Sequence, residues 1–222
     1  FDDLHHQGVK NVIEEAERLK IKRFILMSAN GVKKEGAKYQ TSKYLGEMAL
    51  INSNLNWTIF RPSLIFGNSD GREEFCAQLK KDMLSLPFPA PLFHKGLLPF
   101  NAGQFKMSPI HVKNVASFFV KSLKMDTTFN KTYELGGPDD YTWKEIIKII
   151  SNAYGKNKWT IPAPVFPIKV LASFLDSFKW FPITNGQLTM LLEGNTCNSD
   201  KTFEEFNIKP IKFDKDSLNY LN

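Results

Sequence analysis

The sequence contains little cysteine and no long apolar run. Its 222 residues include only two cysteines, Cys76 and Cys197, and neither a CxxC nor a Cys/His ligand spacing occurs. Disulfide frameworks and structural zinc sites need such groupings, so we predict no metal site and favour a reducing compartment. No apolar run reaches the ~18 residues that span a bilayer, and the first residues show no basic-then-apolar targeting pattern. We therefore expect no transmembrane segment.

Clustered basic charge is missing as well. The formal net charge is +6, from 29 Lys and Arg against 23 Asp and Glu, but the lysines are spread along the chain. Nucleic-acid sites concentrate basic side chains in a groove or patch. The composition therefore favours a solvated basic surface and no nucleic-acid partner.

The first third of the sequence alternates helical and extended patterns. Apolar residues follow helical spacing from Gly8 to Lys20, and a short apolar run typical of a strand buried on both faces covers 22–28. A second helix is expected over about 38–52. A second strand is expected over 57–61, because the residue before Pro62 favours extended geometry. This order predicts an α/β fold with a Rossmann-type, doubly wound parallel sheet.

A glycine-rich turn is the element that this fold would normally begin with. The first strand–helix turn of such a sheet binds the pyrophosphate of a dinucleotide, yet no GxGxxG or GxxGxxG occurs here. The sequence opens on a helix and not on a strand. We therefore expect the N-terminal strands of the sheet to lie outside this sequence.

Tyr39 and Lys43 are the residues best suited to chemistry. They stand four apart on the second predicted helix and so share one face. An ammonium beside a phenol favours the phenolate, so we expect Lys43 to lower the pKa of Tyr39. The same spacing recurs at Tyr154 and Lys158, but that pair follows the end of a predicted helix, and we do not expect a site there.

The later sequence adds a helix over 111–123, a strand at Tyr133 and a helix that begins after Thr142 with a capping box. Its strongest apolar stretch, residues 165–181, predicts either an amphipathic helix packed on its own domain or a docking surface for a partner or membrane. Both interpretations stay open. His111 is expected to form structural hydrogen bonds, and the adjacent His5 and His6 are expected in solvent and not on a metal.

Taken in order, several motifs resemble the extended and atypical short-chain dehydrogenases. They are QGVKNVIEEAERLKIKRFILMSANG, YQTSKYLGE, WTIFRPSLIFG, SPIHVKNVASFFVKSL and YELGGPDDYTWKEI. Further segments, LPFPAPLF, GLLPFNAGQFKMSPIHV and ITNGQLTMLLEGNT, resemble the branch of respiratory complex I accessory subunits and their bacterial relatives.

The resemblance implies a domain organisation and a site. Residues 1–67 would be the C-terminal part of an NAD(P)-binding Rossmann domain, and 68–222 a smaller α/β substrate-side region from which 108–136 returns to the Rossmann domain. The implied catalytic residues are Tyr39, Lys43 and Ser28. The implied cofactor-binding residues are Ser28, Ala29, Tyr39, Lys43, Arg61, Pro62, Ser63 and Leu64. The cofactor would be NADP or NAD, and Arg61 is expected to pair with a carboxylate outside this sequence.

Two departures bear on the function that the resemblance implies. Ser28 precedes Tyr39 by only 11 positions, a shorter gap than active members of the family usually show, and Ser28 could instead simply end a strand. The second departure is the missing front of the domain, which leaves this sequence alone without a pyrophosphate site. The complex I branch is thought to hold its nucleotide mainly as a structural ligand. We therefore expect a nucleotide-binding accessory or assembly component of respiratory complex I, in contact with its membrane-complex subunits.

Two further functions stay open at this point. One is an active NAD(P)-dependent oxidoreductase or sugar-nucleotide-type epimerase or dehydratase that uses Tyr39 and Lys43. The other is a regulatory NAD(P) sensor without chemistry. The expected location is cytoplasmic or peripheral on the inner face of the inner membrane, which is the matrix side in a mitochondrion.

Overall fold

The computed structural model describes residues 2–68, 70–72, 74–96, 98–168, 170 and 185–222. At its centre is a parallel sheet in the order β1–β2–β7, made of β1 (Arg23–Met27), β2 (Asn56–Pro62) and β7 (Lys131–Leu135). Met27 pairs with Phe60, which pairs with Tyr133, so the carboxyl ends of the strands lie at one edge of the sheet. The predicted parallel α/β arrangement is confirmed.

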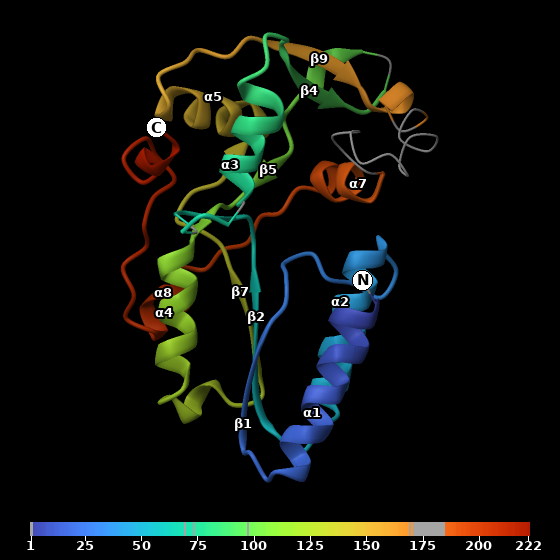
Figure 1. Ribbon diagram of the computed structural model, residues 1–222, viewed down its shortest axis with the longest axis vertical. Coiled ribbons are helices and arrows are strands. Elements are labelled where there is room, and N and C mark those ends of the chain that lie inside the picture. Colours follow the sequence, from blue (N-terminus) through green and yellow to red (C-terminus); the bar gives the residue numbers. More distant parts are fainter. Residues whose placement is uncertain (1, 69, 73, 97, 169, 171–184) are drawn as a thin grey trace.

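Helices cover both faces of this sheet (Figure 1). On one face are α1 (Gly8–Arg18) and α2 (Lys38–Ile51), and on the other are α4 (Val112–Ser122) and α8 (Asp200–Glu205). Successive residues of a strand point to opposite faces, so Ile59 packs among the residues of α1 and α2, while Phe60 packs against α4 and α8. Both side chains are fully buried, and burial of each stabilises the fold by roughly 2 kcal/mol.

Short strands and helices build the other half of the molecule. Three small sheets pair β3 (Ile65–Phe66) with β6 (Ile110–His111), β4 (Ala90–His94) with β9 (Thr160–Pro164), and β5 (Lys106–Met107) with β8 (Tyr141–Thr142). The helices here are α3 (Phe75–Leu79), α5 (Trp143–Ala153) and α7 (Asn185–Glu193). Trp143 lies at the centre of this half, where its indole Nε1 donates to the carbonyl of Pro91 at 2.9 Å.

Single helical turns connect these elements. Two are π-helical, Asp3–Gln7 before α1 and Lys80–Leu84 after α3. The others are 3₁₀ turns at Pro99–Asn101, Asp126–Thr128 and Asn219–Leu221.

The bounds of the main elements follow the sequence prediction within two or three residues. The capping box before α5 is confirmed, because the Thr142 hydroxyl accepts from the amide of Glu145 while the Glu145 carboxylate accepts from the amide of Thr142. Most of the apolar stretch 165–181 lies outside the described residues. Within the described part of the chain, no helix is long and apolar enough to cross a membrane.

Candidate functional site

Two loops leave the carboxyl ends of β1 and β2 side by side. The amide of Ser28 donates to the carbonyl of Phe60 at 2.7 Å, and the amide of Asn30 donates to the carbonyl of Pro62 at 2.9 Å. Ser28 is buried, and no described residue offers its hydroxyl a hydrogen-bond partner. Leaving a buried hydroxyl unpaired costs ~1–3 kcal/mol. The end of β1 therefore holds a polar group that a ligand can satisfy.

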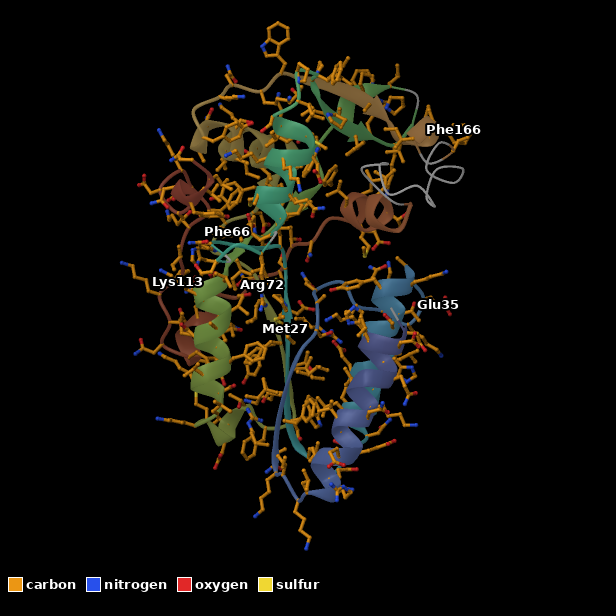
Figure 2. The ribbon with its side chains drawn as sticks, viewed as in Figure 1. Met27, Glu35, Phe66, Arg72, Lys113 and Phe166 are labelled. Carbon is orange, nitrogen blue, oxygen red and sulfur yellow. The ribbon has the colours of Figure 1, made fainter. Side chains whose placement is uncertain are left out.

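The first turns of α2 carry Tyr39 and Lys43 to this edge of the sheet. Lys43 Nζ donates to the carbonyl of Met27 at 3.1 Å, and it lies 5.7 Å from the centroid of the Tyr39 ring. Met27 is the last residue of β1 and lies near the middle of the molecule (Figure 2). Tyr39 and Lys43 thus share a helix face, and Lys43 reaches the strand end that Ser28 follows.

Burial moves the pKa values of this pair away from the predicted direction. Burial raises the pKa of Tyr39 and lowers that of Lys43, and the nearby Glu47 carboxylate partly opposes the change at Lys43. The expectation that Lys43 lowers the pKa of Tyr39 is therefore wrong for this state of the site. The physical reason is that a half-buried phenol loses more by desolvation of its phenolate than it gains from an ammonium that hydrogen-bonds elsewhere.

The partner of Arg61 lies within this chain. The Arg61 guanidinium makes a two-pronged ion pair with Glu47 on α2, with distances of 2.9 Å to Oε1 and 2.5 Å to Oε2. The Glu47 side chain is 0% exposed and that of Arg61 is 24% exposed. The prediction of a carboxylate from outside the sequence is wrong. This pair fixes α2 against β2 one helical turn beyond Lys43.

The other residues implied for cofactor binding have different surroundings. Ala29 is half-buried between Ser28 and Asn30, and Pro62 is buried at the end of β2. The Ser63 hydroxyl donates a hydrogen bond to the carbonyl of Asn195 at 2.7 Å, and Leu64 packs against the hydrophobic core around Trp143. The structure therefore brings Ser28 and Lys43 to one strand end, whereas the side chains of Ser63 and Leu64 contact the C-terminal half.

Gln40 and Glu193 join the loop after β1 to α7, and the sequence analysis missed both. Gln40 donates to the carbonyl of Gly31 at 2.9 Å and to Glu193 at 3.0 Å. Glu193 also pairs with Lys33 at 2.7 Å. A contact between residues more than 150 positions apart leaves no local signal, so only the folded chain reveals it. These bonds hold the loop that precedes Tyr39.

His5, His111 and the second Tyr/Lys pair make contacts within the fold, away from the end of β1 or against Tyr39. His111 precedes α4, and its Nδ1 accepts from the amide of Lys113 at 3.1 Å. His5 is half-buried and packs edge-on against Tyr39, with ring centroids 5.3 Å apart, so it differs from the solvated side chain expected. Tyr154 lies at the end of α5, and Lys158 lies beyond that helix and donates to the carbonyl of Leu86.

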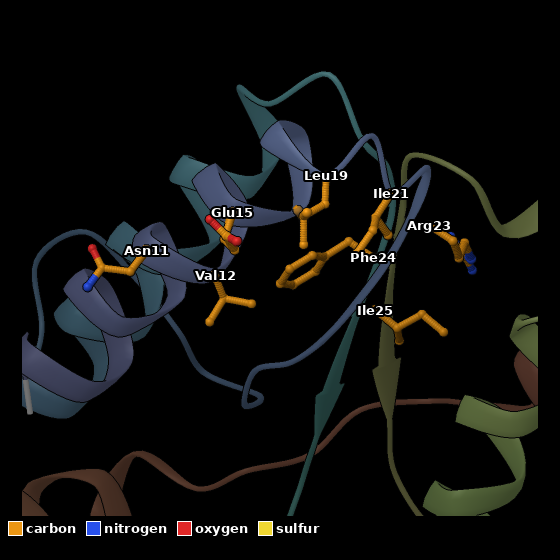
Figure 3. A pocket seen from close by; sticks show the side chains of 9 residues that line it. Asn11, Val12, Glu15, Leu19, Ile21, Arg23, Phe24 and Ile25 are labelled. Carbon is orange, nitrogen blue, oxygen red and sulfur yellow. The ribbon is translucent and has the colours of Figure 1, made fainter.

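Two hollows of the described surface lie away from Tyr39 and Lys43. Figure 3 shows an open, mainly apolar pocket of about 530 Å³ between α1 and β1, lined by Val12, Leu19 and Phe24 among others. A polar hollow of about 340 Å³ follows β7, between residues 137–140 and 196–200. Among the described residues, no group of three or more His, Cys, Asp or Glu side chains is placed to hold a metal ion.

The N-terminal third of the chain matches a known protein family. The family described as NAD(P)H-binding matches residues 2–83, which therefore form part of an NAD(P)-binding domain. The chain is 26% identical over its full length to the mitochondrial NADH-ubiquinone oxidoreductase 40 kDa subunit of Neurospora crassa, covering 56% of that protein. It is 29% identical, over 90% of its length, to subunit 9 of the mitochondrial NADH dehydrogenase [ubiquinone] 1 alpha subcomplex of Arabidopsis thaliana, covering 48% of it. The chain spans about half the length of these relatives.

Solved structures support the same fold. The crystal structure of dTDP-glucose 4,6-dehydratase from Bacillus anthracis in complex with NAD matches all of this chain with a TM-score of 0.68 and 16% identity, over 67% of that enzyme. At this identity the likeness shows the fold alone, which is a Rossmann-like α/β fold. The predicted fold class is confirmed, and the chain has the predicted similarity to complex I accessory subunits.

Proposed function

We propose that this chain, which carries an NAD(P)-binding domain and is homologous to complex I subunits, serves as an accessory or assembly component of respiratory complex I that holds its nucleotide structurally. The full-length similarity to the 40 kDa subunit supports the complex as partner. On this proposal the protein lies peripherally on the matrix side of the inner membrane, which protease protection in intact and opened mitoplasts would test.

The residues at the end of β1 fit the nicotinamide–ribose half of a dinucleotide. The Ser28 hydroxyl is buried and has no partner among the described residues, so it can donate to or accept from a nicotinamide amide or a ribose hydroxyl. Lys43 offers ammonium protons to ribose oxygens, and its bond to the Met27 carbonyl fixes where that ammonium lies. Ala29 follows Ser28 in the loop after β1, and Pro62 is the last residue of the neighbouring strand β2. When bound, NAD(P) would supply hydride-transfer chemistry.

The raised pKa of Tyr39 is the observation that favours structural binding over turnover. A tyrosine that exchanges protons at neutral pH needs a pKa brought down towards that pH. Here burial moves the Tyr39 pKa upward, and the ammonium that would oppose the shift donates to a backbone carbonyl. The phenol therefore stays protonated. It is a poor base at neutral pH for that reason.

The test compares two variants in the full-length protein. Lys43→Met should lower the affinity for nucleotide at least about tenfold, since one charge-assisted hydrogen bond contributes ~1.5–3 kcal/mol. The variant should therefore retain less nucleotide. Tyr39→Phe should retain nucleotide and leave assembly of the complex unchanged. Tyr154→Phe and Lys158→Met are matched controls, because they share the spacing but lie outside the site. Nucleotide released by denaturation and complex assembly on native gels are the readouts.

An active enzyme of the epimerase or dehydratase type is the second candidate. The unpartnered Ser28 hydroxyl favours it, because such a group can orient a substrate carbonyl. Loss of a measurable NAD(P)H-dependent rate in Tyr39→Phe, with nucleotide still bound, would establish this function and reject the structural one.

A further inference from the structure

The β4–β9 ribbon lies at the end of the molecule farthest from α1 (Figure 1). Exposed aromatic side chains belong to the segments that form or adjoin it. They belong to residues that the sequence separates by up to 78 positions. The group, here called the aromatic rim, consists of Phe88, Phe100, Trp159, Ile161 and Phe166. Its four aromatic members are 70–82% exposed, whereas soluble proteins rarely leave several such rings in water together.

Strand pairing explains how these residues come together. The amide of Ala90 donates to the carbonyl of Trp159, which brings the start of β9 beside the segment that contains Phe88. The 3₁₀ turn that contains Phe100 contacts both β4 and β9. Phe166 follows the end of β9 and lies near that end of the ribbon (Figure 2). The rim therefore borders the whole length of the ribbon.

Basic residues predominate in the segments that form the rim, although Glu193 on α7 is close enough to Lys95 to interact with it electrostatically. Residues 80–103 and 154–168 contain five lysines and a single acidic residue, Asp82. Lys95 and Lys156 are exposed, and they lie at the two ends of the ribbon, just after β4 and just before β9. A surface with aromatic side chains and flanking lysines is complementary to a negatively charged interface.

The outer edge of β9, which pairs with no other described strand, argues against an added protein strand. Pro162 and Pro164 lie in β9 and lack the N–H groups that a further strand would need. A bilayer surface needs no such backbone pairing. Aromatic rings are favoured at the headgroup level, and lysines beside them meet lipid phosphates.

We propose that the aromatic rim and its lysines form a docking surface for an anionic bilayer, which attaches this protein peripherally to a membrane. The proposal rests on the peripheral location proposed above and names the surface responsible for it, but it does not depend on the nucleotide-binding role. The structural basis is the set of exposed aromatic side chains along the ribbon, with an exposed lysine near each of its ends.

Flotation with lipid vesicles tests this surface directly. The full-length protein should float with vesicles of phosphatidylcholine and phosphatidylglycerol in equal parts, and not with phosphatidylcholine alone. Phe88→Ser with Trp159→Ser should abolish flotation, and Lys95→Gln with Lys156→Gln should weaken it about thirtyfold, at ~1 kcal/mol per lysine. Val120→Ser is the matched control, since Val120 is 64% exposed on α4, away from the ribbon.

Three results would overturn the proposal. The first is equal flotation of the control and the Phe88/Trp159 variant, and the second is an absence of flotation with anionic vesicles. The third would point to a protein partner instead: a photocrosslinker at position 88 that labels a protein subunit and no lipid in isolated membranes. Because the four substituted side chains are exposed, circular dichroism of each variant should match that of the unmodified protein.

Discussion

The ion pair between Glu47 and Arg61 allows a quantitative test of how α2 is held against the sheet. Removing one partner of a buried ion pair costs ~3–5 kcal/mol, because the other charge remains uncompensated in the interior. Arg61→Met would leave the fully buried Glu47 carboxylate without both of its guanidinium donors. Since Arg61 itself is partly exposed, we expect the low end of that range, about 3 kcal/mol, or roughly 6–12 °C in Tm for a domain of this size.

Substitution of Glu47 should lower the free energy of unfolding less than Arg61→Met does, and substitution of both residues should lower it least. Glu47→Leu leaves a guanidinium that can turn towards water, so we expect about 2 kcal/mol. Combining the two replaces the pair by apolar side chains of similar volume, which is often close to neutral. We therefore expect the double variant to lie within about 1 kcal/mol of the unmodified chain.

Urea unfolding followed by circular dichroism measures these differences. The control is Glu14→Gln, which breaks the exposed Lys10–Glu14 pair and should change stability by less than about 0.5 kcal/mol. The reasoning fails if Arg61→Met costs no more than the control, or if the double variant loses the sum of the two single effects.

Three further predictions concern the capping residues and the loop before α2. Burial and the nearby Lys113 lower the pKa of His111, so the neutral ring that caps α4 contributes stability that is present above about pH 6.5 and is lost as the pH falls through the lowered value. His111→Ala should cost ~1 kcal/mol, whereas His111→Asn should keep the cap and remove the acid sensitivity seen in unfolding at different pH values. Thr142→Ala should cost ~1 kcal/mol in urea unfolding, and Thr142→Ser should restore most of it. Glu193→Gln should leave global stability within about 0.5 kcal/mol, because its pair with Lys33 is partly exposed, yet speed proteolysis of residues 31–37.

Periodicity in the sequence carried most of the fold prediction. The apolar patterns predicted the helix over 8–18 and the strands β1 and β2, and short-range rules also identified the cap at Thr142. Burial matches the pattern in β2 but not in β1, which is only half-buried and whose Met27 is 48% exposed, so the expectation that this strand is buried on both faces is wrong. The small sheets of the other half were not predicted. Strands of two residues, such as β3 and β6, are too short to produce a period, and their pairing partners lie about 45 positions away.

Electrostatic relations at the site were less accessible from the sequence. Helical spacing correctly places Tyr39 and Lys43 on one face, because that relation is local. The direction of the Tyr39 pKa depends on how much surrounding chain removes water from the phenol, and spacing does not contain that information. The pairing of Arg61 with Glu47 joins a strand to a helix, so it too required the fold.

The same contacts that shape the candidate site also stabilise the fold without any ligand. Lys43 binds the last carbonyl of β1, and Glu47 binds Arg61 one turn later, so two successive turns of α2 are tied to two strands. Selection for a stable domain alone would retain Lys43, Glu47 and Arg61. Their presence therefore does not distinguish an enzyme from a structural nucleotide binder. The hydroxyl of Tyr39 is the discriminating group, because proton transfer requires it: an active enzyme would lose its NAD(P)H-dependent rate in Tyr39→Phe, whereas a structural role predicts no such rate to lose.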